Sequence, residues 1–247
     1  MELVSVDETP SRRVDLAAAY RIASQDGFAE GICNHLTAKA EGAEDEFLVI
    51  PYGLHWSEVT PSSLLRVTTG GDVLEGAGDV EPTALHIHAA VHHERPDVTA
   101  VFHTHMPYAT AMAALQDPRL LPISQNALRF HDRVAYEMHY SGAIDSEREG
   151  ALLASSLREK DILFHAHHGV IVLGQSIAEA YDDLYYLERA CQIQVFAMGT
   201  GARLNYIADS IASAYTARDH RDVLRLEAQA HFDARKRLLQ ASSRFDS

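Results

Sequence analysis

The chain has 247 residues and a mass of 27.3 kDa, and 47% of its residues are hydrophobic, so it is long enough to bury a sizeable core. Its formal net charge of -14 argues against a nucleic-acid or anionic-membrane partner, because there is no cationic surplus to displace counterions. Only two cysteines occur and no apolar run approaches the ~20 residues of a spanning helix, so we expect a cytoplasmic protein with no membrane contact that binds a small molecule.

The first third of the chain alternates predicted helices with short predicted strands. Apolar residues at helical spacing predict a helix over 13–26. Short apolar runs between turn residues then predict a β-rich stretch over 36–74, with a tight hairpin connection at 70–72. Pro82 is well placed in the first turn of a second helix, and Pro96 ends it.

The rest of the chain continues the alternation of strands and helices. Predicted strands cover residues 99–105, about 120–124, 161–164 and 170–173, and predicted helices cover 108–115, 145–159, a long stretch after a capping box at Ser176 and Glu179, and roughly 219–240. Interleaved strands and helices with an early run of hairpins favour an α/β protein with a mixed sheet flanked by helices. We expect one domain over 1–247, with a core from about 13 to 200 and a helical C-terminal extension over 201–247.

Histidine is the most unusual feature of the composition, since the chain contains 15 and has three H-x-H pairs. His103 and His105 fall on the predicted strand 99–105, where residues two apart share a face, so both rings can bind one metal at about 2.1 Å each. His86 and His88 fall on a predicted helix, where residues two apart point to different faces. We therefore expect packing or surface roles for His86 and His88.

The third pair, His165 and His167, brackets a predicted turn next to His168. One of these three rings is expected to be a metal ligand, while the others orient it or contact the substrate.

Four segments together resemble the class II aldolase/adducin family, in the subgroup similar to adducin heads: RPDVTAVFHTHMPYATAMAAL, LLPIS, AHHGVIVLG and LERACQIQ. The resemblance extends over about residues 13–200. It implies a three-layer α/β/α fold with a central mixed, largely antiparallel sheet. It also implies a divalent metal bound by His103, His105 and His168, with zinc expected and manganese or iron as alternatives.

The resemblance further implies that the loops GICNHLTAK and PYGLHW bind the anionic end of the substrate, through Asn34 and Gly53. An ordinary turn asparagine and turn glycine are the alternative. Tyr52 stands where phosphosugar aldolases have a small hydroxyl residue, and Pro82 stands where a serine is usual, which disfavours phosphate recognition. We expect Tyr52 to line a site for a non-phosphorylated hydroxy-acid, keto-acid or carbonyl compound, with Trp56 either nearby or in the core.

The resemblance also exposes a missing catalytic group. In the sugar aldolases, a glutamate one helical turn before the residue that matches His88 acts as the acid and base, and here that position is Ala84. Loss of such a proton-transfer group commonly costs ~100-fold to 10,000-fold in rate. Glu81, about one turn earlier, is the candidate substitute, although a carboxylate at a helix start is also a typical cap.

Three functions stay open at this point. The first is a metal-dependent lyase of the aldolase or decarboxylase type, and decarboxylation tolerates Ala84 better because it needs no base to begin. The second is a non-haem iron oxygenase, and the third is a non-catalytic scaffold similar to the adducin head.

The resemblance implies a homotetramer with sites at subunit boundaries. The helix that carries Tyr181, Leu184 and Tyr185 has more apolar surface than one packing stripe needs, which favours a second contact face. Tyr136 and Tyr140 are the candidates for residues donated to a neighbouring metal site, with Tyr140 as a catalytic residue, and ordinary packing is the alternative for both.

Overall fold

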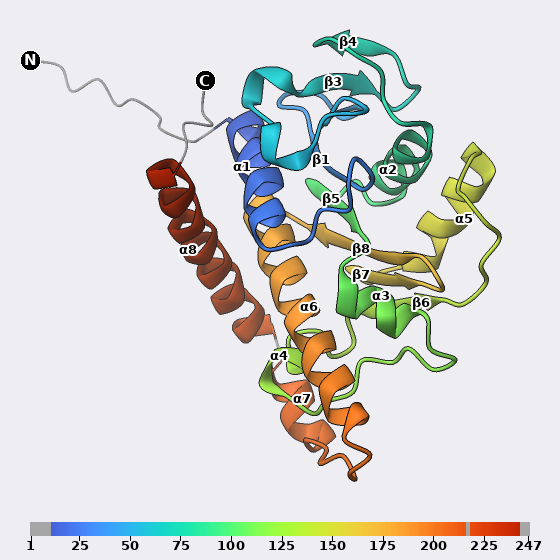
Figure 1. Ribbon diagram of the computed structural model, residues 1–247, viewed down its shortest axis with the longest axis vertical. Helices are drawn as coiled ribbons and strands as arrows, with labels where there is room; N and C mark the ends of the chain where they lie inside the picture. Colours follow the sequence, from blue (N-terminus) through green and yellow to red (C-terminus); the bar gives the residue numbers. More distant parts are fainter. Residues whose placement is uncertain (1–10, 216–217, 243–247) are drawn as a thin grey trace, which may run out of the picture.

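A single eight-stranded sheet organises the molecule (Figure 1). The computed structural model describes residues 11–215 and 218–242. The sheet has the order β4-β3-β2-β1-β5-β8-β7-β6, and every neighbouring pair is antiparallel except β6 with β7. The strands are β1 (His35–Lys39), β2 (Glu46–Val49), β3 (Leu65–Thr68), β4 (Val73–Glu75), β5 (Ala100–Thr104), β6 (Val134–Glu137), β7 (Ile162–His165) and β8 (Gly169–Gly174).

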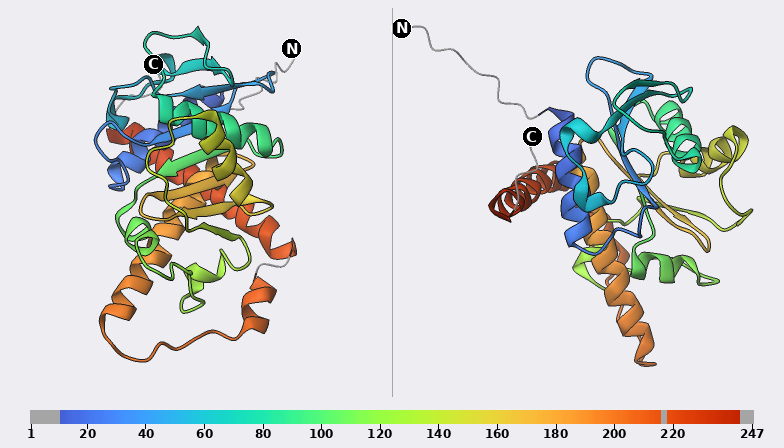
Figure 2. Two further views of the ribbon diagram at one scale, coloured as in Figure 1. Left: turned by 90° about the vertical axis from the view of Figure 1, so that its right-hand side faces the viewer. Right: turned by 45° about the horizontal axis from the view of Figure 1, so that its top comes forward.

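Helices cover both faces of this sheet, so the predicted three-layer α/β/α arrangement is confirmed (Figure 2). One face packs against α1 and α6, and the opposite face packs against α2 and α5. Helix α8 lies outside α1 and α6. The helices are α1 (Arg12–Gln25), α2 (Pro82–Glu94), α3 (Pro107–Ala113), α4 (Gln125–Leu128), α5 (Glu147–Leu157), α6 (Ile177–Gly199), α7 (Asp209–Tyr215) and α8 (Arg218–Ser242), with short 3-10 turns at Trp56–Glu58 and Pro61–Ser63.

The period-two alternation of the central strands divides the core into two clusters. Phe102 of β5 and Val172 of β8 belong to the cluster under α1 and α6, whereas Val101 and Ile171 belong to the cluster under α2 and α5. His103 is two residues beyond Val101, so its side chain lies on the α2 face of the sheet. Because side chains alternate along the strand, His103 lies on the same side of the sheet as α2.

Trp56 belongs to the core and not to a substrate site. Its ring is fully buried and packs edge-on against Tyr20, with 5.2 Å between ring centroids. The Tyr20 hydroxyl in turn donates to the Leu36 carbonyl and accepts from the Leu36 amide, at 2.6 and 2.8 Å. The core alternative for Trp56 is therefore the correct one.

The strand predicted near 120–124 does not form. Pro122 has no amide hydrogen, and the two amides before it donate to side chains, Leu120 to the Tyr136 hydroxyl and Leu121 to Gln194. The edge of the sheet is formed instead by β6, which the sequence did not predict. The other predicted strands and helices are present, and no helix within residues 11–215 and 218–242 has the length and apolarity to cross a bilayer.

Candidate metal centre

The pairing of β5 with β8 brings three histidines together. His103 lies in β5, His105 follows its end, and His168 immediately precedes β8, whose Val170 pairs with Thr104. One ring nitrogen from each histidine lies within 4.8 Å of the others, and the ring centroids are 4.6 to 5.0 Å apart. These are the three residues that the sequence and the resemblance singled out.

Gly169 permits this close approach. A Cβ atom added at Gly169 would lie 2.4 Å from the Thr104 carbonyl oxygen and 2.7 Å from the His105 ring. Any other residue at this position would push β8 and His168 away from the end of β5. The glycine of the H-G turn is thus a geometric requirement of the histidine cluster.

Hydrogen bonds fix which nitrogen of two of the rings faces the cluster. His103 Nδ1 is 3.0 Å from the Val170 carbonyl, and His105 Nδ1 is 2.5 Å from a Glu30 carboxylate oxygen. Since both partners only accept, each Nδ1 is a donor, which leaves Nε2 as the ring nitrogen available to the cluster. His105 Nε2 is buried without a hydrogen-bond partner among the described residues, as expected for a nitrogen that awaits a metal.

Burial also keeps these rings in the form that binds metals. Burial lowers the pKa of His103 well below its usual range, and the neighbouring His168 and His105 rings lower it further. Burial, followed by the effect of His105 and His165, lowers the pKa of His168 to about 3. Both rings are therefore neutral at neutral pH, and neutral imidazole is the metal ligand.

A second pair, His35 and Glu81, lies next to the cluster. His35 Nε2 is 3.3 Å from a Glu81 carboxylate oxygen, and the His35 ring stacks on His103 with 5.9 Å between centroids. Glu81 also accepts from the Ala84 amide at 2.7 Å and so caps α2. Burial raises the pKa of Glu81, but hydrogen bonds from His35 and from the Ala84 backbone outweigh burial and lower it to about 2. Glu81 is therefore ionised and is both a helix cap and the partner of His35.

Comparison with known proteins decides the family. The family model described as "Class II Aldolase and Adducin N-terminal domain" matches residues 14–195. The chain belongs to the class II aldolase/adducin family.

Among its relatives, a Pseudomonas aeruginosa protein provisionally named a class 2 aldolase is 38% identical over 208 residues, covering 84% of this chain and 78% of the relative. Mouse alpha-adducin is 37% identical over 187 residues, covering 74% of this chain and 25% of the adducin. The aligned region therefore covers only about a quarter of the adducin chain.

Solved structures agree with this fold. An aldolase II superfamily protein from Pseudomonas syringae has a TM-score of 0.86 at 31% identity, with 95% of each chain covered. An L-fuculose 1-phosphate aldolase from Glaciozyma antarctica has a TM-score of 0.84 at 25% identity, covering 100% of this chain and 97% of the other. The central sheet and its helices are thus those of class II aldolases.

Asn34 and Gly53, the two loop residues expected to bind substrate, differ in what they do in the structure: Asn34 bonds the backbone of the metal centre, and Gly53 forms a turn. Asn34 is buried, adopts a left-handed φ of 70°, and accepts from the His105 amide at 2.9 Å through Oδ1. It therefore ties the first loop to the metal centre. Gly53 has a φ of 91°, which favours glycine in this turn, and the neighbouring Tyr52 side chain is 60% exposed.

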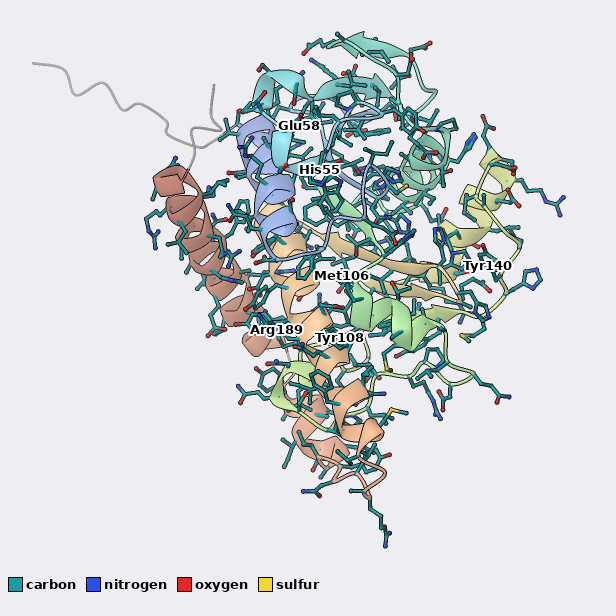
Figure 3. The ribbon with its side chains drawn as sticks, viewed as in Figure 1. His55, Glu58, Met106, Tyr108, Tyr140 and Arg189 are labelled. Carbon is teal, nitrogen blue, oxygen red and sulfur yellow. The ribbon has the colours of Figure 1, made fainter. Side chains whose placement is uncertain are left out.

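Tyr136 makes packing contacts within its own chain, which favours the packing alternative for this residue. Its hydroxyl accepts from the Leu120 amide at 2.9 Å, and its ring stacks on Phe164 with 5.6 Å between centroids. Burial raises the pKa of Tyr136 to about 12. Tyr140 differs, because it is 48% exposed on the loop after β6 (Figure 3) and its ring lies 6.0 Å from that of His165 in the same chain.

His88 occupies the interior beside the centre and is not part of the three-histidine cluster. Its Nδ1 is 2.7 Å from the Thr37 hydroxyl, which also lies 2.9 Å from His92 Nε2. The packing role predicted for His88 is thus observed. The sequence did not place Glu30 or His35 at the metal centre, and the only signal for them was their distance of a few positions from the predicted Asn34 loop. His165, which was expected to bind, orient or contact at the turn, lies 3.0 Å from His168 through the Nδ1 atoms of the two rings.

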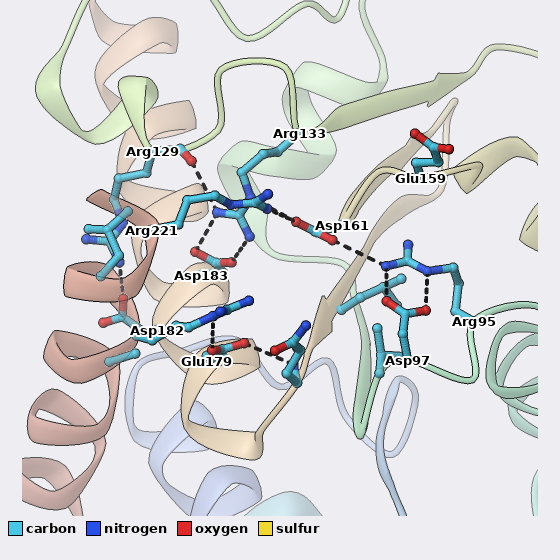
Figure 4. Close-up of a pocket in the computed structure, with 17 residues that line it drawn as sticks. Arg95, Asp97, Arg129, Arg133, Glu159, Asp161, Glu179, Asp182, Asp183 and Arg221 are labelled. Carbon is cyan, nitrogen blue, oxygen red and sulfur yellow. Dashed lines mark hydrogen bonds and ion pairs between the residues drawn. The ribbon is translucent and has the colours of Figure 1, made fainter. Parts of the chain in front are cut away.

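A cavity of about 260 Å³ lies at the other end of the same strands, where β7 begins and β8 ends (Figure 4). Its walls are ion pairs: Arg133 bonds both Asp161 and Asp183, and Arg129 bonds Asp182. The guanidinium groups and carboxylates neutralise one another. The ion pairs that line this cavity therefore hold α6 and α8 against the sheet. The histidine cluster, and not this cavity, is the candidate site.

Replacing Asp182 by alanine is expected to destabilise the fold by about 3–5 kcal/mol, because breaking a buried ion pair leaves an uncompensated charge. Arg129 and Asp182 are 6% and 2% exposed, and Asp182 also accepts from His231 at 2.7 Å. Urea denaturation measures the change. Asp117→Ala is the control, because Asp117 pairs with Arg119 on the surface, and it should change stability by less than about 0.5 kcal/mol. Equal effects of the two substitutions would contradict the buried-pair assignment.

Proposed function

We propose that the chain binds one divalent metal through Nε2 of His103, His105 and His168, with zinc expected and manganese or iron as alternatives. Three neutral imidazoles that leave a further coordination position for substrate are typical of a catalytic metal site. The outward hydrogen bonds of the rings, the buried unpartnered Nε2 of His105 and membership of the class II aldolase/adducin family support this assignment.

His103→Ala and His168→Ala are each expected to lose the metal, because two remaining ligands hold it poorly. Metal analysis of protein purified without added metal gives the stoichiometry and identifies the ion. His86→Ala is the matched control, since His86 is partly exposed on α2 and lies outside the cluster, and it should keep the wild-type metal content. Unchanged metal content in His168→Ala would rule out this site.

We infer that the reaction is the breaking of a carbon-carbon bond in a small, non-phosphorylated hydroxy-acid, keto-acid or carbonyl compound. When bound, a divalent metal polarises the substrate oxygens and stabilises the negative charge that develops as the bond breaks. The first loop, fixed by Asn34, and the second, turning at Gly53, flank the substrate, with Tyr52 as the contact that disfavours a phosphate.

Proton transfer needs a group other than Ala84. Glu81 is poorly suited to accept a proton directly, because it is strongly ionised and caps α2. It instead holds the His35 ring against His103, so its proposed catalytic contribution passes through His35. Tyr140, exposed beside His165, is the proposed second catalytic group. This arrangement favours decarboxylation over the retro-aldol reaction, because decarboxylation needs no base to begin.

Wild-type protein loaded with its native metal should turn over a member of a panel of non-phosphorylated hydroxy-acids and keto-acids, and should not cleave L-fuculose 1-phosphate at ordinary enzymatic turnover of about 1 s⁻¹ or more. His103→Ala is the control for metal dependence. Efficient cleavage of the sugar phosphate would contradict the assignment of Tyr52 and Ala84.

Ala84→Glu then tests the missing group directly. A rise in weak lyase activity would support the lyase, and no rise, together with bound iron, would favour the oxygenase. The adducin relatives support a third outcome, a non-catalytic scaffold, which any metal-dependent turnover would exclude.

We also propose a cytoplasmic homotetramer. The apolar surface of the first half of α6, expected to form a second contact face, is covered within the chain, since Tyr181 packs on Phe232 of α8. The end of α6 is different, because Phe196 is 59% exposed and Ile193 and Met198 are also exposed there. Both cysteines are free thiols, which fits a reducing compartment.

Light scattering at micromolar concentration should give about four times the chain mass of 27.3 kDa. Phe196→Asp should shift the population to smaller species by placing a charge in the contact face. Leu226→Asp is the control, because Leu226 is also apolar and exposed but lies on α8. A wild-type mass of one chain would exclude the tetramer.

A further inference from the structure

Helix α3 begins two residues after the candidate ligand His105, and its first turn has no cap of its own. Met106 is the N-cap residue and makes no side-chain hydrogen bond, and Pro107, the first helical residue, has no amide hydrogen. The amides of Tyr108 and Ala109 need acceptors from elsewhere, because the first amides of a helix have no partner within it. Ala109 is fully buried, so its amide needs a partner from the protein.

One carboxylate of α6 supplies both acceptors. Glu188 Oε1 accepts from the Tyr108 amide at 2.8 Å, and Oε2 accepts from the Ala109 amide at 2.9 Å. Glu188 is 6% exposed, so both hydrogen bonds are shielded from competing water. Its negative charge also interacts favourably with the partial positive charge at the start of a helix. Glu188 therefore caps α3 from a distant part of the chain.

The place of this cap connects it to the metal centre. His105 immediately precedes the N-cap of α3, and its own amide donates to Asn34 at 2.9 Å. The backbone at His105 is therefore held by Asn34 on one side and by Glu188, through the turn that follows, on the other. Helix α6 also continues the chain from β8, which follows His168, and it packs against α3. Glu188 thus ties the chain segment of His168 to that of His105, in addition to the pairing of β5 with β8.

We propose that Glu188 is a positioning residue of the metal centre, which caps α3 from α6 and so fixes the strand-to-helix junction that carries His105. This inference rests on the proposed metal function. It gives a role to the segment LERACQIQ, which the resemblance singled out and the proposed function leaves unused. The hydrogen bonds of Glu188 go to backbone amides, so it acts on His105 through the backbone.

The same helix provides a matched control residue. Gln194 is 1% exposed and holds another backbone segment, since its Oε1 accepts from the Leu121 amide at 2.7 Å and its Nε2 donates to the Arg119 carbonyl at 2.9 Å. That segment carries none of the three candidate ligands. Glu188→Gln and Gln194→Glu each keep the side-chain shape and remove one of two hydrogen bonds, so they differ mainly in the segment that is released.

Chelator competition with Zn²⁺ on the full chain measures the consequence for affinity. Glu188→Gln should weaken binding by about 3-fold to 10-fold, less than the roughly 10-fold to 100-fold typical of losing a group that bonds a ligand directly. The absorption spectrum of bound Co²⁺, which responds to ligand geometry, should change in the same variant.

Gln194→Glu should keep the wild-type Zn²⁺ affinity and Co²⁺ spectrum, although both variants should lower the midpoint of thermal unfolding. Wild-type affinity in Glu188→Gln, or equal losses in the two variants, would overturn the proposal. If Glu188→Gln does not fold, Glu188→Asp takes its place, because it keeps the charge on a side chain shorter by one methylene group. The same loss of affinity is then expected, and wild-type affinity would again overturn the proposal.

Amide hydrogen exchange tests the junction without any metal. The Tyr108 and Ala109 amides should exchange faster in Glu188→Gln than in the wild type or in Gln194→Glu, because glutamine offers only one acceptor oxygen. Unchanged exchange of both amides would contradict the cap and with it the proposal. A wild type that binds no Zn²⁺ would refute the metal function, while the exchange rates would still show whether Glu188 holds the junction at His105.

Discussion

The antiparallel pairing of β5 with β8 is the interaction on which the candidate centre depends. These strands are far apart in the sequence, and their register places the end of β5 beside the start of β8, with Thr104 opposite Val170. Because Gly169 has no Cβ, the H-G turn can close directly on the Thr104 carbonyl and the His105 ring. Hydrogen-bond register, rather than loop conformation, therefore sets the distances among the three histidines, and a strand scaffold holds such distances well.

The hydrogen-bond partners around the three rings support the candidate metal centre as much as the rings themselves do. A carbonyl and a carboxylate each bond the outer nitrogen of His103 and His105, and a neighbouring imidazole contacts that of His168, so the surroundings orient all three candidate ligands. A centre assembled in this way loses little conformational freedom on binding, which favours affinity.

The catalytic side of the site departs from the sugar aldolases at one helix. The resemblance aligns Ala84 with the glutamate of those enzymes, and the carboxylate at the start of the same helix is the Glu81 cap of α2. The helix start thus gains a stable cap and a fixed His35 partner, while the strong base is lost. Membership of a family that contains both aldolases and adducins fits such a site, since the fold and the metal-binding geometry are independent of this single position.

The sequence by itself determined most of the elements and two of the three candidate ligands. Period-two and helical patterns predicted most strands and helices, because such patterns depend on local geometry. H-x-H on a strand predicted that His103 and His105 share one site, and the resemblance to the family added His168. Pro122 within an apolar run led to a false strand, because the run did not reveal that side chains would take the neighbouring amides.

Only the tertiary structure decided the contacts between distant segments. The contacts of His35 with Glu81 and of Glu30 with His105 depend on strand order and on which helix covers which face. Trp56 and Tyr136 were likewise assigned to packing by partners far along the chain. A local sequence pattern cannot predict such partners, because the register of the assembled sheet determines which distant residues come into contact.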